Sequence, residues 1–276
     1  MRFSIVIPTF NNLDYLKLCI KSIKKNSKFD HEIIIHNNGK AELSSNFIQE
    51  NKITYSKTEY NAGICEGVNL GANKSTTDYI VYAHDDFYFL PGWDVIFKKE
   101  IENLKTNLFY LSGTMVQNGQ VDFNCGENIK DFDEEKLLSN NNKIDYFDFQ
   151  GSTWAPHVIH KEVWNRVGGF SEEFNPGIAS DPDLNMKLWN EGVRIFKGLN
   201  KFKVYHFGSI TTRKNKDIKQ NRGDKMFLKK WGFSTKFFKK HYLKSKTKYD
   251  GPLNEPKKNL VFFFDLLICK IKYLLT

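Results

Sequence analysis

A histidine and two carboxylates, His84, Asp85 and Asp86, directly follow an apolar, β-forming stretch at residues 79–83. An open α/β sheet binds ligands at the carboxyl ends of its strands, so we expect these three side chains at such an edge. Carboxylates there suit Mg²⁺ or Mn²⁺, which proteins typically hold with one or two acids together with substrate phosphates. The same pattern also fits a strand followed by a solvated acidic turn.

Strand-like and helix-like segments alternate before these acids, which indicates the elements that would position them. The strands are predicted at residues 3–8, 32–36, 53–55 and 79–83, and the helices at residues 15–25, 47–51 and 63–74. Such alternation implies right-handed crossovers between parallel strands. The chain is therefore predicted to have an α/β fold, with a mainly parallel central sheet flanked by helices.

The second part of the chain has a less regular pattern, with further elements predicted around an irregular region at residues 107–149. We expect a strand at 108–116, a polar loop or helix at 131–142, helices at 161–167 and 181–191, and short strands at 194–196 and 203–205. The last strand leads into His206. Length and composition support one large domain with an appendage, because 276 residues with 40% hydrophobic content can bury a sizeable core.

The cysteines and the amino-terminal sequence indicate the cellular compartment in which the protein is expected. The four cysteines are far apart and lack metal-ligand spacing, which argues against a zinc site or a disulfide framework. They are Cys19, Cys65, Cys125 and Cys269. The apolar run at the amino terminus is too short for a signal peptide. We therefore expect a cytoplasmic protein.

The net charge of +9 is concentrated at one end of the chain. Residues 213–276 contain 18 Lys/Arg and 5 Asp/Glu, a local net charge of +13, so residues 1–212 carry −4. Such a tail suggests an acidic partner, either anionic lipid or nucleic acid. Nucleic acid is not expected, because no zinc-finger, RNP-type or KH-type pattern accompanies the lysines.

Residues 259–275 form an apolar segment interrupted by Asp265, Lys270 and Lys272. It is too short and too charged to span a bilayer, which takes ~20 mostly apolar residues. An interfacial helix on an anionic membrane is one prediction, which would make the protein peripheral on the inner face of the cell membrane. The alternative is that the apolar side chains cover a patch on the rest of the chain or on a partner chain.

Four pieces of sequence occur in a specific order: residues 4–11, 32–39, 61–86 and 168–184. In this order they resemble family 2 glycosyltransferases of the GT-A fold. The resemblance spans roughly residues 1–212, and residues 213–276 would form a basic, amphipathic helical extension. It implies an inverting, metal-dependent transfer of a sugar from a nucleotide-sugar to a hydroxyl of a glycan or lipid-linked acceptor. The motif at residues 229–232 is similar to that of bacterial members that build surface polysaccharide.

The resemblance also implies which residues contact the nucleotide-sugar. They are Pro8, Thr9, Phe10, Asn37, Asn61, Gly63, Asn69, His84 and Asp85. His84 and Asp85 would contact the ribose or order the loop. Asn37 stands where the family usually has an Asp that accepts a hydrogen bond from uracil. An amide can still accept through its carbonyl oxygen, so a UDP-sugar is the expected donor.

By the same resemblance, Asp86 and His206 would hold Mn²⁺ or Mg²⁺, which neutralises the leaving diphosphate. Trp154 and Asp183 would lie in the pocket for the donor sugar or the acceptor. Asp181 occupies the position of the family's general base, which takes a proton from the acceptor hydroxyl. Asp183 would support the loop or an acceptor hydroxyl.

Ser180 replaces the usual Glu of that motif. A structural interpretation of the same residues is helix capping, with Ser180 as the N-cap and Pro182 early in the helix.

Three alternatives to a sugar-transferring enzyme follow from the same sequence. A sugar-phosphate nucleotidyltransferase usually begins with a Gly-rich, basic phosphate loop, and residues 8–12 contain neither glycine nor a basic residue. A degenerate GT-A domain that binds sugar nucleotide or glycan without catalysis is suggested by His84, Asn37 and Ser180. A nucleic-acid binder is suggested by the basic tail alone.

Overall fold

The computed structural model describes residues 1–208 and 222–275. The strands are β1 (Ser4–Thr9), β2 (Glu32–Asn37), β3 (Ile53–Lys57), β4 (Tyr79–Tyr82), β5 (Phe87–Phe89), β6 (Phe109–Val116), β7 (Phe149–Gln150), β8 (His157–His160) and β9 (Ile195–His206). The helices are α1 (Leu13–Asn26), α2 (Ser45–Glu50), α3 (Gly63–Ala72), α4 (Trp93–Leu104), α5 (Glu134–Ser139), α6 (Lys161–Val167), α7 (Ser180–Asn190), α9 (Gly223–Trp231), α10 (Thr235–His241) and α11 (Leu260–Leu274), with a 3₁₀ turn η1 (Glu172–Phe174).

The strands form one sheet in the order β3-β2-β1-β4-β8-β6-β9-β5, and β7 pairs with β9. The first four strands in this order are parallel, so their carboxyl ends lie at one edge, with Thr9 opposite Asn37. Every residue of β1 is buried, as the apolar run at residues 5–8 predicts. The predicted α/β fold is confirmed. The parallel arrangement ends at β4, because β8 runs antiparallel to both β4 and β6.

The carboxyl-terminal part of the sheet differs from the sequence prediction. Residues 195–206 form one long strand, β9, where two short strands were predicted, and that prediction is wrong. The pairing with β6 shifts between Gly113 and Thr114, which accommodates Asn200 without breaking the strand. Asn200 donates its amide nitrogen to Tyr146 O at 3.1 Å, so a polar residue that resembles a turn is held within the sheet.

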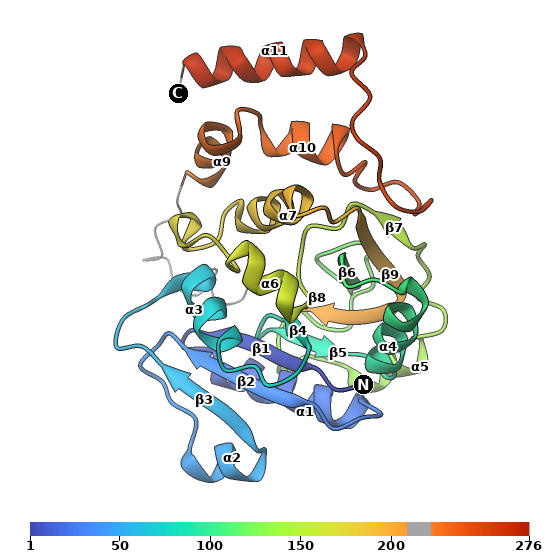
Figure 1. Ribbon diagram of the computed structural model, residues 1–276. Helices are drawn as coiled ribbons and strands as arrows, with labels where there is room; N and C mark the ends of the chain where they lie inside the picture. Colours follow the sequence, from blue (N-terminus) through green and yellow to red (C-terminus); the bar gives the residue numbers. More distant parts are fainter. Residues whose placement is uncertain (209–221, 276) are drawn as a thin grey trace.

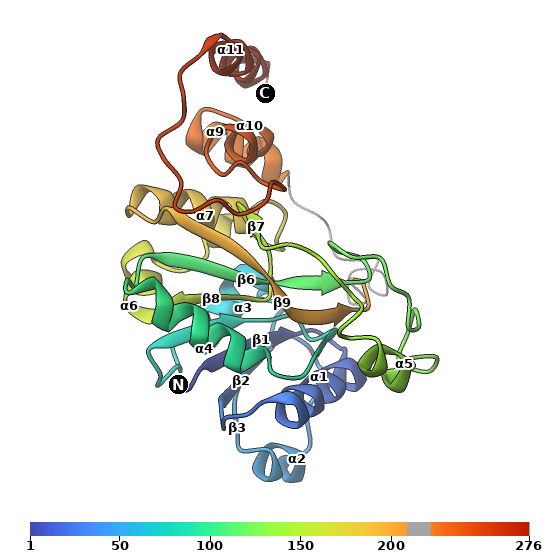
Figure 2. The same ribbon diagram turned by 90° about the vertical axis from the view of Figure 1, so that its right-hand side faces the viewer.

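Helices cover both sides of the sheet, and the carboxyl-terminal helices extend the molecule on one side (Figures 1 and 2). In both views α9 and α10 lie between α7 and α11, and α11 is the outermost of the described elements. The aromatic side chains of α9 and α10 belong to the main hydrophobic core, as Phe227 and Phe238 show. The boundary predicted between residues 212 and 213 lies outside the described residues, and the division into two domains stays a prediction.

Candidate active site

His84, Asp86 and His206 form a cluster at the carboxyl edge of the parallel strands. One possible ligand atom from each side chain lies within 4.8 Å of those of the other two. The loop after β4 supplies His84 and Asp86, and β9 ends in His206. The antiparallel pairing of β5 with β9 sets Phe87 opposite His206, which brings the end of β9 beside Asp86. The Nε2 atom of His206 lies 3.6 Å from Oδ2 of Asp86.

The hydrogen bonds of His206 favour a metal-binding tautomer. Its Nδ1 lies 3.3 Å from Asn118 O, and a carbonyl oxygen can only accept, so Nδ1 carries the proton in this contact. Asn118 Nδ2 in turn donates to His206 O at 3.0 Å. The Nε2 atom then presents a lone pair toward the Asp86 carboxylate. A cation between two such acceptors fits this geometry, and a backbone carbonyl is a common orienting partner for a metal-binding histidine.

The structure places His84 in the same cluster. The resemblance had instead predicted that His84 contacts the nucleotide or orders the loop. Burial lowers the pKa of His84 to about 4; Asp86 opposes this shift and His206 adds to it. The imidazole is therefore neutral at pH 7, which is the form that binds metals. Its ring stacks on Phe87, with 4.8 Å between the centroids. Two imidazoles and one carboxylate suit Mn²⁺, whose other ligands would be phosphate oxygens.

Asp85 connects the loop after β4 to the end of β1 and the loop that follows it. Its Oδ2 accepts a hydrogen bond from Thr9 Oγ1 at 2.7 Å, and its Oδ1 accepts one from Asn12 Nδ2 at 3.1 Å. Burial and the charge of Asp86 raise the pKa of this carboxyl group above its usual range. Since both oxygens bond protein groups, the geometry favours the loop-ordering role over ribose contact for Asp85.

The expected nucleotide side lies where β1 and β2 end. Pro8 is buried and Phe10 is half-buried. Asn37 donates its amide nitrogen to Ala41 O at 2.9 Å and to Tyr55 Oη at 2.8 Å. Its Oδ1 accepts from the Gly39 amide at 2.9 Å and keeps a second lone pair. That lone pair is what a uracil imide N–H would require.

The three remaining residues assigned to the nucleotide-sugar all have structural contacts. Asn69 exchanges two hydrogen bonds with the backbone of Phe170, both 2.9 Å long. The exposed Asn61 accepts from the Gly63 amide at 3.0 Å and so shapes the start of α3. A Cβ atom at Gly63 would lie 2.5 Å from Asn175 Oδ1, which explains why glycine is needed there. Contacts of these residues with the nucleotide-sugar stay a prediction.

Asp181 lies in the first turn of α7. The N-cap of this helix is Ala179, with a left-handed backbone (φ 65°), so the predicted N-cap role of Ser180 is wrong. The Ser180 hydroxyl instead donates to Gly177 O at 2.7 Å. Within the described residues, the buried Oδ1 of Asp181 has no hydrogen-bond partner. Burial raises the pKa of Asp181 to about 7, and the positive charge of Lys239 opposes the shift.

Several residues near Asp181 were not singled out from the sequence. Burial raises the pKa values of Tyr82 and Tyr110 well above the usual range, and the charge of Asp181 adds to both shifts. The Tyr110 hydroxyl also contacts Nδ1 of the buried His157 at 2.8 Å. These residues lie on β4, β6 and β8, and only the pairing of the three strands brings them together. No local sequence pattern marks them.

Trp154 and Asp183 differ in their surroundings. Trp154 is half-buried and stacks on Phe149 at 5.2 Å, and its Nε1 has no hydrogen-bond partner among the described residues. Asp183 is fully buried. Its oxygens accept from Ser171 Oγ at 2.5 Å and from Trp231 Nε1 at 2.8 Å. These bonds favour the supporting role for Asp183, and a pocket role for Trp154 stays a prediction.

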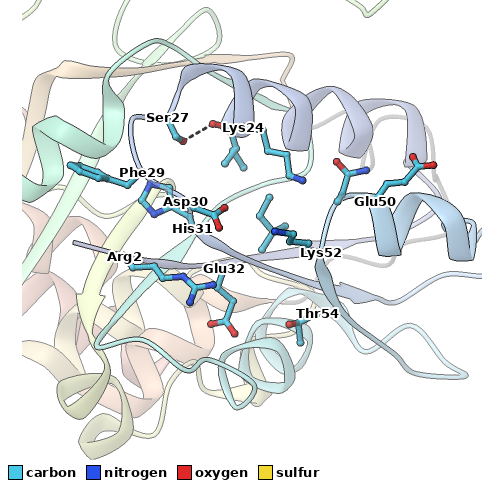
Figure 3. A pocket seen from close by; sticks show the side chains of 13 residues that line it. Arg2, Lys24, Ser27, Phe29, Asp30, His31, Glu32, Glu50, Lys52 and Thr54 are labelled. Carbon is cyan, nitrogen blue, oxygen red and sulfur yellow. Dashed lines mark hydrogen bonds between the residues drawn. The ribbon is translucent and has the colours of Figure 1, made fainter.

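A separate cavity of about 440 Å³ lies at the opposite edge of the sheet, where β1, β2 and β3 begin. Its charged lining combines three basic and three acidic side chains, shown in Figure 3. They are Arg2, Lys24, Lys52, Asp30, Glu32 and Glu50. Because basic and acidic side chains are equally represented, the lining favours neither an anionic nor a cationic ligand. The cavity is also remote from the cluster of His84, Asp86 and His206, which lies at the carboxyl edge of the sheet.

The sequence model described as Glycosyl transferase family 2 matches residues 4–164. The chondroitin synthase of Pasteurella multocida (strain Pm70) is 26% identical over 228 residues, which cover 79% of this chain and 22% of that protein. The uncharacterized glycosyltransferase YwdF of Bacillus subtilis (strain 168) is 33% identical over 104 residues, which cover 37% of this chain and 39% of that protein.

The crystal structure of S. aureus TarS 1-349 has a TM-score of 0.56 at 14% identity, and the match covers 75% of this chain and 60% of that chain. The complex of the same protein with UDP-GlcNAc has a TM-score of 0.55 at 14% identity and covers 74% and 58%. This likeness shows a common fold. The chain spans less than two thirds of each of these proteins. Because the family model matches more than half of the chain, the protein belongs to glycosyl transferase family 2.

Proposed function

We propose that this protein is an inverting, metal-assisted glycosyltransferase that moves a sugar from a UDP-sugar to a hydroxyl of a glycan or lipid-linked acceptor. The observation that carries the proposal is the cluster of His84, Asp86 and His206 at the carboxyl edge of a family 2 fold. A UDP-sugar is supported by the UDP-GlcNAc complex of TarS, which shares this fold.

In the proposed reaction, Asp181 takes the proton of the acceptor hydroxyl while that oxygen bonds to the anomeric carbon. The bond from that carbon to the diphosphate breaks at the same time, and UDP leaves from the opposite face. A divalent cation held by His84, Asp86 and His206 would neutralise charge that builds on the leaving diphosphate. The Oδ1 atom of Asp181, which bonds no described group, is available for the proton.

A donor panel tests this function. UDP-, GDP-, CMP- and dTDP-linked sugars would each be added with Mn²⁺ or with EDTA, and the thermal midpoint recorded. We expect the largest stabilisation from a UDP-sugar with Mn²⁺, because ligand binding to the native state raises its stability. A single displacement inverts configuration, so an α-linked donor should give a β-linked product by NMR. Retained configuration would contradict the mechanism, and binding without any turnover would favour the binding-only alternative.

The proposal also includes attachment to an anionic membrane through α11. None of the described helices is both long and apolar enough to cross a bilayer. One face of α11, continued by the next residue, nonetheless consists of apolar side chains that are between 37% and 88% exposed. They are Leu260, Val261, Phe263, Phe264, Leu267, Ile268, Ile271, Leu274 and Leu275.

These residues occupy about 160° of the helical circumference, and Lys270 and Lys272 border them on either side. Lysines at the borders can extend toward anionic headgroups while the apolar arc enters the interface.

Vesicle sedimentation tests the membrane proposal. The double variant Phe264→Glu with Leu267→Glu should lose binding to vesicles that contain phosphatidylglycerol, because it puts charge in the middle of the apolar arc. The control, Tyr60→Glu with Val95→Glu, makes the same change in net charge at exposed residues outside α11 and should bind normally. Added salt should weaken binding of the unchanged protein. Equal loss in both variants, or no binding by the unchanged protein, would contradict the proposal.

A further inference from the structure

The first turn of α7 is anchored by residues of the carboxyl-terminal extension. Asp183 accepts a hydrogen bond from Trp231 Nε1 at 2.8 Å, and the same oxygen lies 3.0 Å from Lys230 Nζ. Its other oxygen accepts from Ser171 Oγ at 2.5 Å. Asp183 is fully buried, so its charge depends on these partners, because an unpaired buried carboxylate is strongly unfavourable.

Lys230 connects three segments of the chain. Besides Asp183, its Nζ lies 2.8 Å from Glu173 Oε1 and donates to Ser171 Oγ at 3.0 Å. It also lies 5.3 Å from the ring centroid of Phe174. One ammonium group at the end of α9 therefore contacts η1, the residue before η1 and the start of α7. These contacts join the carboxyl-terminal extension directly to the candidate active site.

The start of α7 depends on such anchors. A helix N-terminus is usually fixed by a capping side chain, and the alanine at the N-cap, Ala179, cannot provide one. Asp181 and Asp183 are two residues apart, so they point to sides of the helix that differ by about 200°. The contacts with α9 fix the direction of the Asp183 side chain. Because the two residues belong to the same helical turn, these contacts thereby also fix the direction of the Asp181 side chain, which lies on the side of the helix away from α9. The extension also presents the half-buried Lys239 of α10 to Asp181; burial lowers the pKa of that lysine, and the negative charge of Asp181 opposes the shift.

We propose that Lys230 and Trp231 are positioning residues for sugar transfer. Through Asp183 they fix the first turn of α7, and thereby the direction in which the Asp181 carboxylate meets the acceptor hydroxyl. This inference rests on the proposed function, because it takes Asp181 as the general base. It gives α9 a part in the reaction that is independent of any contact between α11 and lipid.

Kinetics of the full chain test this inference. Trp231→Phe removes the indole donor and keeps a ring, and Lys230→Met removes the ammonium group. UDP release would be followed with UDP-sugars, and UDP affinity measured by calorimetry. We expect kcat to fall by about 10- to 100-fold in both variants, the range for a misplaced catalytic group, with donor KM and UDP affinity nearly unchanged. Lys230→Arg should restore most of kcat, because it keeps the charge and the donors.

Trp93→Phe is the matched control. Trp93 is a fully buried residue of α4 whose Nε1 donates to Ser27 Oγ at 3.0 Å, so the substitution deletes the same kind of bond far from α7. It should lower stability without lowering kcat. Amide hydrogen exchange adds a measurement that needs no donor: the Asp183 amide, bonded to Ala179 O at 3.1 Å, should exchange faster in Trp231→Phe and unchanged in Trp93→Phe.

The inference would be overturned if Trp231→Phe left both kcat and the exchange rate of the Asp183 amide unchanged. It would also be overturned if the fraction of unfolded protein accounted for the whole loss of kcat. Asp181→Asn, assayed in parallel, separates this failure from failure of the proposed function. Full activity of Asp181→Asn would refute the assigned base. An inactive Asp181→Asn beside a fully active Trp231→Phe would refute only the positioning role.

Discussion

Replacing Asp181 with Asn should lower the rate of sugar transfer by about 10²–10⁴-fold, the range for loss of general acid–base assistance. The amide keeps the size of the side chain but cannot accept the proton of the acceptor hydroxyl. Donor binding should change little, because the cluster of His84, Asp86 and His206 is untouched. Calorimetry with UDP and a transfer assay on the same preparation measure the two effects separately. Full transfer activity in the variant would show that another group is the base.

The pH dependence of kcat offers a second measurement on Asp181. Burial raises the pKa of Asp181 to about 7, and only the ionised form can take a proton, so kcat should increase as pH rises through about 7. The charge of Lys239 opposes this shift. Lys239→Met should therefore move the profile to higher pH. Lys240→Met, at a neighbouring lysine that pairs with Asp265 at 2.6 Å, is the control and should leave the profile in place.

Replacing Asp86 with Ala should abolish metal-dependent binding of UDP. Asp86 supplies the carboxylate of the cluster, and the two histidines alone offer no negative charge to a divalent cation. Titration of the protein with Mn²⁺, followed by the EPR signal of the free ion, would measure the cation directly. Calorimetry with UDP in Mn²⁺ and in EDTA would measure its effect on the nucleotide. Equal UDP affinity of the unchanged protein under both conditions would contradict the metal assignment.

His206→Gln provides a graded comparison for this prediction. An amide oxygen can still contact a cation, but imidazole is a stronger ligand for Mn²⁺, so binding should weaken and not vanish. The intact hydrogen bond from Asn118 to His206 O uses the backbone, which the substitution keeps. A His206→Gln variant as defective as Asp86→Ala would indicate that the histidine also maintains the local fold, which a thermal midpoint would reveal.

The local sequence pattern predicts many of the elements whose signals are local, but not the helix α4. The apolar runs of β1 and β2 are continuous, and α6 has the predicted bounds, ending at the left-handed Gly168. The pattern fails where an element depends on distant partners. The three residues of β5 were not recognised, because so short a strand exists only through its pairing with β9. The long β9 was divided in two, because Asn200 and Lys201 resemble a turn.

The candidate site likewise combines residues that the sequence predicts with contacts that it does not predict. Motif order predicted Asp86 and His206, and the structure brings them together, but through a strand pairing that the sequence does not reveal. His84 was assigned elsewhere, because the first position of the motif usually holds another residue type. The contact of Trp231 with Asp183 joins residues 48 positions apart. The periodic spacing of apolar residues carries no information about contacts between residues so far apart in the sequence. Long-range side-chain contacts are therefore the part of the site that this sequence alone could not predict.

The contact between α9 and α7 also has a consequence for the order of folding. The bond from Lys230 to Ser171 joins residues 59 positions apart, and it can form only after the chain has been synthesised as far as α9. The parallel strands β1 to β4, by contrast, lie within the first 82 residues, which leave the ribosome first. A nascent chain can therefore assemble its parallel sheet well before the start of α7 is fixed. Competence for transfer would arise only after α9 has been synthesised and has docked.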